Sequence, residues 1–159
     1  MSAGLASAVG IDIGGTRVKS VLVDRDGVVL QEDERDSVEG ADALVALVES
    51  ALASLGVDAA LPVGIACPGL AQLDHRAIAC MPGRLSGLEG LVFGQALGRE
   101  AYVLNDAHAA TLGEKVLGAA AGRRHVVMLT LGTGVGGGVV INGRLYTGAF
   151  GRAGHFGHT

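Results

Sequence analysis

A short run near the start of the chain has the residue types that bind a phosphate group. It reads Asp12-Ile-Gly14-Gly15-Thr16, with Lys19 three residues further on, and it follows an apolar segment. Two glycines let backbone N–H groups approach an anion, while Thr16 adds a hydroxyl and Lys19 a positive charge. Asp12 could hold Mg²⁺ through water. The alternative is a plain hairpin in which the Asp12 carboxylate bonds the backbone of its own turn.

A second glycine-rich stretch, residues 129–146, has apolar segments on both sides of a turn at residues 132–134. Its dipeptide Asn142-Gly143 is typical of a two-residue type I′ hairpin turn, in which both central residues take φ > 0. We therefore expect the glycine loop to join two strands. The loop either forms an anion-binding nest of N–H groups or is a glycine-rich bend without a ligand.

Asn105 and Asp106 stand between a short apolar segment, residues 101–104, and a helical pattern at residues 107–117. Ligand sites of open α/β sheets lie beyond the carboxyl ends of the strands. A carboxylate at this position could act as a general base on a hydroxyl group. The alternative is that the two residues only cap the helix.

His155 and His158 lie three residues apart near the end of the chain. Two histidines alone do not make a zinc site. His75, His108 and His125 show no ligand spacing with this pair, and we expect surface or hydrogen-bonding roles for them.

The apolar pattern predicts an α/β fold: a three-stranded meander, then alternating helices and strands, then a hairpin. This order favours a mixed sheet with helices on its faces. The predicted strands are residues 8–13, 18–23, 28–31, 61–66, 101–104 and 126–131, the predicted helices are 41–55, 88–97 and 107–117, and residues 70–87 are predicted to be irregular.

Composition narrows the class of protein. The 159 residues are 49% hydrophobic with few aromatics, so we expect a packed core of Val, Leu, Ile and Ala. A net charge of −4 without a basic run argues against nucleic acid or an anionic membrane as the partner. The longest uncharged stretch, residues 126–143, is broken by glycines, and no signal peptide is apparent. Cys67 and Cys80 do not form a disulfide framework, which favours the cytoplasm.

Four motifs, in this order, resemble the ROK family (repressor, open reading frame, kinase), which includes bacterial glucokinases and N-acetylmannosamine kinases. The similarity runs from about Val9 to the last residue. The motifs are Ile11-Asp12-Ile-Gly14-Gly15-Thr16-x-x-Lys19, Gly64-Ile-Ala-Cys-Pro68-Gly69, Asn105-Asp106-Ala-His-Ala-Ala-x-x-Gly113-Glu114 and Leu131-Gly132-Thr133-Gly134-Val-Gly136-Gly137-Gly138.

The resemblance implies an actin-like, ribonuclease H-like fold with two lobes. Residues 1–122 would form the N-terminal lobe, and residues 123–159 would form the first hairpin of the second lobe. Members of the family are about twice as long. We therefore expect the adenosine site, a cysteine-rich zinc loop and most of the second lobe to be absent from these residues.

The resemblance also implies ATP-dependent phosphorylation of a hydroxyl group on a hexose or N-acetylhexosamine, with Mg²⁺. The phosphates of ATP would lie between the turn at residues 12–16, assisted by Lys19, and the Gly132-Thr133-Gly134 loop. Asn105 and Asp106 would hold the sugar, and Asp106 would take the proton from the attacking hydroxyl. A homodimer is compatible with this resemblance.

The end of the chain departs from the family signature, Gly-Glu-x-Gly-His. It reads Gly154-His155-Phe-Gly157-His158. His155 thus replaces a glutamate that contacts the sugar. His158 matches a histidine that touches the sugar and, in many members, also binds a structural zinc. The resemblance implies sugar contacts for both histidines, and zinc only in a longer form of the protein.

Two other functions fit the same residues. One is a non-catalytic, truncated remnant of a ROK protein. The other is a sugar-responsive regulator, which we rank lower because Asp12 lies too near the start for a winged helix to precede it. We expect the 159 residues by themselves not to phosphorylate sugar.

Overall fold

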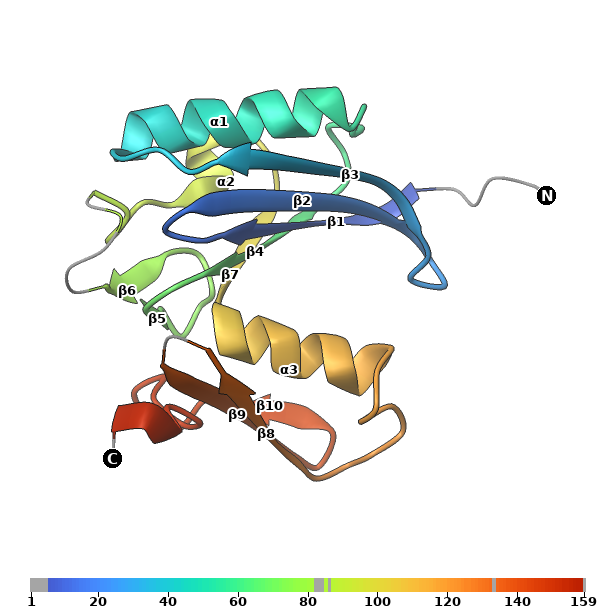
Figure 1. Cartoon of the computed structure of the whole chain (residues 1–159), viewed down its shortest axis with the longest axis vertical. Helices are drawn as coiled ribbons and strands as arrows, with labels where there is room; N and C mark the ends of the chain where they lie inside the picture. Colours follow the sequence, from blue (N-terminus) through green and yellow to red (C-terminus); the bar gives the residue numbers. More distant parts are fainter. Residues whose placement is uncertain (1–5, 82–84, 86, 133, 159) are drawn as a thin grey trace. The chain divides into compact units, whose positions relative to one another are not determined.

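The structure is a computed structural model that describes residues 6–81, 85, 87–132 and 134–158 (Figure 1). The chain divides into two compact units, residues 1–104 and 105–159. The first helix of the second unit, α3 (Asp106–Val116), precedes the lobe boundary expected after residue 122. It belongs to the second unit because it packs on the strands that follow it. The division into family lobes stays a prediction.

The first unit is built on a five-stranded sheet of order β3-β2-β1-β4-β7. The predicted meander is confirmed, since β1–β2 and β2–β3 are antiparallel, whereas β4 runs parallel to β1. The sheet is therefore mixed, as expected. Its strands are β1 (Ala6–Ile13), β2 (Arg17–Asp24), β3 (Val29–Asp36), β4 (Val63–Cys67) and β7 (Ala101–Asn105).

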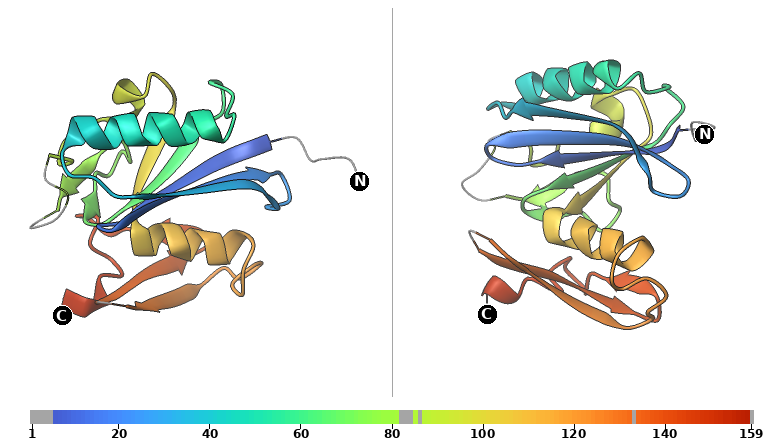
Figure 2. Two further views of the ribbon diagram at one scale, coloured as in Figure 1. Left: turned by 45° about the horizontal axis from the view of Figure 1, so that its top comes forward. Right: turned by 45° about the vertical axis from the view of Figure 1, so that its right-hand side comes forward.

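Two helices, α1 (Ala41–Ser54) and α2 (Phe93–Ala96), lie on the same side of this sheet (Figure 2). Helix α1 buries Leu44, Val48 and Leu52 at helical spacing, and α2 buries Phe93. These side chains share one core with the alternating inward residues of the strands. The helix predicted over residues 88–97 is wrong in length, because Gly87 and Gly90 take positive φ values, 90° and 77°, and break the helical backbone.

The loop predicted to be irregular contains a small hairpin. Strands β5 (Leu70–Ala71) and β6 (Ile78–Cys80) pair antiparallel. Ile78 is fully buried and joins the core of the first unit. A two-residue strand has no detectable period, so the pattern could not predict it.

Strand β3 is longer than predicted, because its second half is charged and offers no apolar signal. It lies at the edge of the sheet. Arg17 of β2 forms ion pairs with Asp36 at 3.2 Å and with Glu34 at 3.6 Å. Arg35 bonds Asp33 at 2.6 Å and the hydroxyl of Ser50 on α1 at 2.6 Å. Charges along an edge strand also discourage pairing with another chain.

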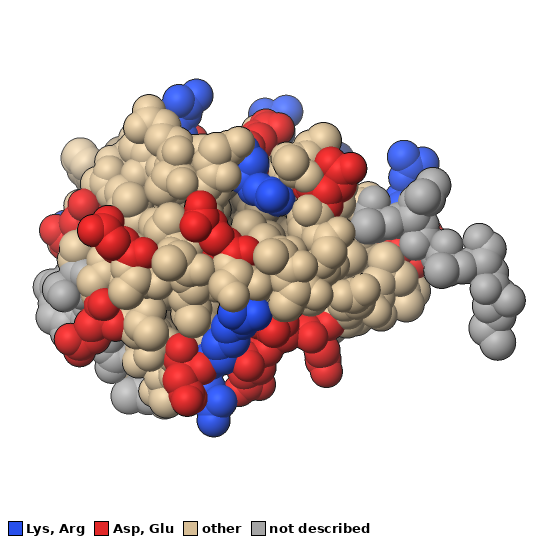
Figure 3. All heavy atoms as spheres, turned by 90° about the horizontal axis from the view of Figure 1, so that it is seen from above, with Lys and Arg blue, Asp and Glu red and all other residues tan. Residues whose placement is uncertain are grey.

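On the face shown in Figure 3, acidic side chains are spread widely, and basic side chains lie among or beside them. No single-signed patch dominates the visible part of this face.

The second unit consists of α3 and a three-stranded antiparallel sheet of order β10-β9-β8. The predicted hairpin turn is confirmed, with φ of 53° at Asn142 and 80° at Gly143. A 3₁₀ helix, η1 (Phe156–His158), ends the described chain. The strands are β8 (Val126–Leu131), β9 (Val135–Ile141) and β10 (Arg144–Tyr146). Within the described ranges, no helix is both long enough and apolar enough to cross a membrane.

Candidate functional site

The Asp12–Lys19 corner of the first unit is a tight turn between β1 and β2. The N–H of Gly14 donates to the carbonyl of Arg17 at 2.9 Å, and Asp12 is paired in register with Lys19. Ile11 and Ile13 are buried, so strand alternation directs Asp12 away from the core. The side chains of Asp12, Thr16 and Lys19 are exposed. The turn therefore presents all three polar groups to solvent.

The fold itself gives no reason for a glycine at position 15. Its backbone is not left-handed, and a Cβ built on it would meet no described atom within 4 Å. Gly14, in contrast, would bring a Cβ to 3.0 Å from the carbonyl oxygen of Arg17. Neither φ nor protein packing accounts for glycine at position 15. The missing side chain leaves space above the backbone, as phosphate binding requires.

The turn between β8 and β9 has the same property. Built Cβ atoms on Gly132 and Gly134 would meet no described atom within 4 Å. The N–H of Gly132 donates to the carbonyl of Gly134 at 3.0 Å, which closes the turn. Thr133 lies outside the described residues. Two glycine turns, one in each unit, therefore keep open space beside the backbone.

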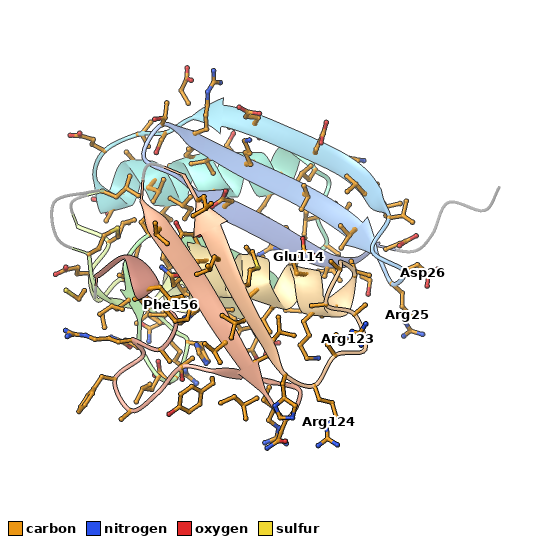
Figure 4. The ribbon with its side chains drawn as sticks, turned by 60° about the horizontal axis from the view of Figure 1, so that its bottom comes forward. Arg25, Asp26, Glu114, Arg123, Arg124 and Phe156 are labelled. Atoms are coloured by element: carbon orange, nitrogen blue, oxygen red, sulfur yellow. The ribbon has the colours of Figure 1, made fainter. Side chains whose placement is uncertain are left out.

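The three glycines that follow, at positions 136–138, have another purpose. A Cβ on Gly136 would lie 3.0 Å from the Cβ of Ala107, and one on Gly138 would lie 2.2 Å from the Oγ1 of Thr111. On the opposite face, a Cβ on Gly137 would lie 2.7 Å from the ring of Phe156 (Figure 4). These glycines allow α3 and η1 to approach the two faces of β9. Any anion nest is thus confined to residues 132–134.

The sequence left open whether Asn105 and Asp106 cap the helix or offer a carboxylate to a ligand, and the structure shows one residue suited to each role. Asn105 is 6% exposed and caps α3, since its Oδ1 accepts the N–H groups of Ala107 at 3.0 Å and His108 at 3.2 Å. Asp106 is the first residue of the helix and is exposed. Its Oδ1 accepts the N–H of Ala107 at 2.8 Å.

His108 is the site residue that the sequence analysis did not single out. It is 2% exposed, and its Nε2 lies 2.7 Å from the carbonyl oxygen of Ala153. Its ring contacts that of His155 edge to face, with centroids 5.4 Å apart and planes at 75°. His108 lies three residues after the cap residue Asn105, so both lie on the same side of the helix. This spacing is the sequence signal that could have identified His108 as a site residue.

The structure places the predicted residues in two groups, one in each unit. The second unit brings the segment of His155 against α3, the helix that Asp106 begins. The first group is the Asp12–Lys19 corner, and the second unit contains Asn105, Asp106, Gly132, Gly134 and His155. His158 ends η1, and its side chain lies outside the described part of the chain.

A structural zinc was expected only in a longer form. Across the described residues, no three His, Cys, Asp or Glu side chains lie where they could hold one metal ion. Cys67 lies in β4 and Cys80 in β6, both in the first unit. The side chains that the structure describes therefore do not fit a zinc centre.

Known proteins resemble this chain over nearly its whole length. A glucokinase of Thermotoga maritima is 36% identical over 157 residues, which cover 94% of this chain and 49% of that protein. An N-acetylmannosamine kinase of Salmonella newport is 36% identical over 163 residues, covering 96% and 54%. The crystal structure of a ROK family glucokinase from Streptomyces griseus with glucose and AMPPNP superposes with a TM-score of 0.83 at 33% identity, over 96% of this chain and 50% of that one.

These comparisons settle the family and the fold. The chain spans about half the length of the curated relatives it matches. Its solved neighbours include ROK sugar kinases, so its sheets and helices are those of an actin-like ATPase fold. The ROK family profile matches residues 8–159. The chain is therefore a member of the ROK family.

Proposed function

We propose that this chain carries the sugar-binding and phosphate-binding residues of a kinase that phosphorylates a hexose or an N-acetylhexosamine. Asp106 is its general base. One observation carries the assignment: an exposed carboxylate stands at the first turn of α3, directly after β7, on a cap that a buried Asn105 fixes. This is the position at which open α/β sheets bind their ligands.

In the proposed reaction, Asp106 accepts the proton of the sugar hydroxyl. The hydroxyl oxygen then forms a bond to the γ-phosphorus of ATP, and the bond from that phosphorus to the β–γ bridging oxygen breaks, releasing ADP. Phosphoryl transfer depends mainly on positioning and on neutralising charge. Asp12 would help to hold the Mg²⁺ that accompanies ATP, and Lys19 would add a second positive charge to neutralise the phosphates.

The open glycines support the phosphate part of this proposal. Gly15, Gly132 and Gly134 are not required by packing against described atoms or by a left-handed backbone. Bare backbone N–H groups beside free space are what a phosphate chain needs. Thr16 and Thr133 would add hydroxyl donors to the two turns.

The sugar part depends on the second unit. Asn105 and Asp106 would hold the sugar hydroxyls, with His155 and His158 at the end of the same unit. His155 is an imidazole where the family signature has glutamate, so it offers fewer acceptor positions to sugar hydroxyls. This difference favours an altered sugar preference, or a protein that binds sugar without phosphorylating it.

We also propose a cytoplasmic location, where ATP and reduced thiols are available, and the homodimer that the resemblance allows. Neither assignment affects the chemistry of Asp106. A zinc ion would belong to a longer form in which cysteines complete a site with His158.

The test is an Asp106→Asn exchange in this chain extended by the C-terminal half of a ROK glucokinase. Loss of a general base should lower kcat by ~10²-fold or more, while the KM for sugar changes much less. Asp26→Asn, in an exposed turn of the first unit, is the matched control and should leave kcat unchanged. An unaltered kcat in the Asp106→Asn protein would remove this residue from the mechanism.

A further inference from the structure

We infer that His108 is a positioning residue, which fixes the segment carrying His155 to the helix that Asp106 begins. The inference rests on the proposed function, because it concerns the sugar-binding end of the second unit. His108 does not belong to the sugar-binding set that the resemblance implies. It acts through Ala153 and His155.

The hydrogen bond defines the orientation of the His108 ring. A carbonyl oxygen can only accept, so Nε2 must carry the hydrogen that points to Ala153 at 2.7 Å. The bond joins residues 45 positions apart in the sequence. The His108 ring is buried, which reduces competition from water for this bond.

The ring contact adds a second constraint. An edge-to-face arrangement at 5.4 Å and 75° fixes the tilt of one imidazole relative to the other. Gly154, between the two contact points, takes φ of 91°, and a Cβ there would lie 2.8 Å from the carbonyl oxygen of Gly137. The segment is thus held by β9 on one side and by His108 on the other.

The first turn of α3, which contains His108, also contains the proposed general base, Asp106. The N–H of His108 donates to Oδ1 of Asn105 at 3.2 Å, and Asp106 lies between these two residues. His108 therefore contacts the cap of α3 through its backbone and the His155 segment through its ring. A shift of His108 would change the distance between His155 and Asp106, and with it the shape of the sugar site.

Two substitutions separate the bond from the ring. His108→Phe keeps an aromatic ring of similar size but loses the donor. His108→Gln keeps an N–H donor at similar reach. His125→Gln, at an exposed histidine in the loop before β8, is the matched control. Each protein is compared for amide hydrogen exchange over residues 147–157 and for binding of glucose and N-acetylmannosamine by calorimetry.

We expect His108→Phe to raise exchange over residues 153–156 and to weaken sugar binding about tenfold, the effect of one buried hydrogen bond. His108→Gln should restore most of the affinity, and His125→Gln should match the wild type. Wild-type affinity in His108→Phe would overturn the inference. Faster exchange with unchanged affinity would also overturn it, because the role would then be structural only.

Two further results keep the outcomes distinct. If the wild-type chain binds none of these sugars, the Asp106→Asn comparison in the extended protein decides the proposed function, and the exchange rates alone decide whether His108 fixes the His155 segment. If His108→Phe does not fold, the exchange rate of the His108 Nε2 proton is measured instead in the wild-type protein by nitrogen-detected NMR. A slowly exchanging Nε2 proton on His108 supports the inference, and a rapidly exchanging one refutes it.

Discussion

Gly138 of β9 and Thr111 of α3 are in such close contact that a methyl group on the glycine would come within 2.2 Å of the threonine Oγ1. Thr111 is fully buried, and its hydroxyl donates to the carbonyl of Ala107 at 2.7 Å. Helix α3 therefore packs directly on the backbone of the strand. The glycine run has a packing function here, although its composition resembles that of a phosphate loop.

Gly138→Ala should destabilise the second unit by about 1–3 kcal/mol, the usual cost of overpacking a tight contact. Chemical denaturation measures the change. Gly113→Ala is the matched control, because Gly113 lies in α3 with open space around its Cβ. Alanine there should stabilise the helix by about 0.5–1 kcal/mol.

A double variant checks the cause of the Gly138→Ala effect. Thr111→Ala removes Oγ1 and Cγ2 but leaves a Cβ that would still lie 2.8 Å from the new methyl group. Adding Thr111→Ala to Gly138→Ala should therefore recover only part of the lost stability. The two substitutions should then have a non-zero coupling energy, which means that their effects on the unfolding free energy do not simply add. Strictly additive effects would show that the contact does not explain the destabilisation.

Gly15→Ala, unlike Gly138→Ala, should affect ligand binding and not stability. Because a Cβ at this position meets no described atom, the unfolding free energy should change by no more than about 0.5 kcal/mol. The methyl group would occupy the space that the proposal assigns to phosphate, so affinity for Mg²⁺-ATP should fall at least about tenfold. Calorimetry with Mg²⁺-tripolyphosphate isolates the phosphate contribution. Equal affinities of the variant and the wild type would argue against phosphate binding at this turn.

Asp33 gives a prediction on pH. The pKa of this carboxyl lies below 3.8, mainly because the Arg35 side chain donates a hydrogen bond to it. Burial raises the pKa, whereas a hydrogen bond from the Ser54 hydroxyl lowers it further. A lowered folded-state pKa gives stability that is present above the unfolded pKa and is lost as pH falls through the folded value.

Asp33→Asn should therefore be less stable than the wild type at pH 7, by about 1 kcal/mol or less. The difference should shrink as pH falls below about 4, where the unfolded carboxyl begins to protonate. Urea midpoints at pH 7 and pH 2.5 measure it, with Asp26→Asn as the exposed control. A pH-independent difference would mean that the Arg35 bond is not responsible.

The sequence predicted most elements because their apolar periods are long. The meander, α1, β4, β7, α3 and the β8–β9 hairpin all appear near their expected positions. Strand β3 was too short in the prediction because its outer half is charged, and charge carries no periodic signal at an edge. The β5–β6 hairpin was missed because its strands are too short to show alternation.

The candidate site was predictable in part. Asn105 and Asp106 stand where a strand gives way to a helix, and that transition is visible in the sequence. Their separate roles, one as a cap and one as an exposed carboxylate, depend on side-chain direction and came only from the structure. His108 and Ala153 are far apart in the chain, and single-sequence patterns contain no signal for a contact at that separation.

The last prediction is that the 159 residues alone do not phosphorylate sugar. Relatives named as kinases are about twice as long, so a full set of ATP contacts would need residues beyond this match. The outer side of β8 supports the same expectation: Leu131 is 82% exposed, Val127 67% and Leu129 56%. Exposed apolar strand faces of this kind are usually covered by further structure. Catalysis by closing kinases also depends on excluding water, which requires both lobes.

A coupled ADP-release assay with ATP, Mg²⁺ and glucose, mannose or N-acetylmannosamine tests this. The wild-type chain should give no sugar-dependent rate above that of its Asp106→Asn counterpart. Extending the chain with the C-terminal half of a ROK glucokinase should restore a rate that Asp106→Asn then removes, because only the extended protein can close over the reacting groups. Turnover by the short chain, abolished by Asp106→Asn, would instead show that these residues already form a complete catalytic site.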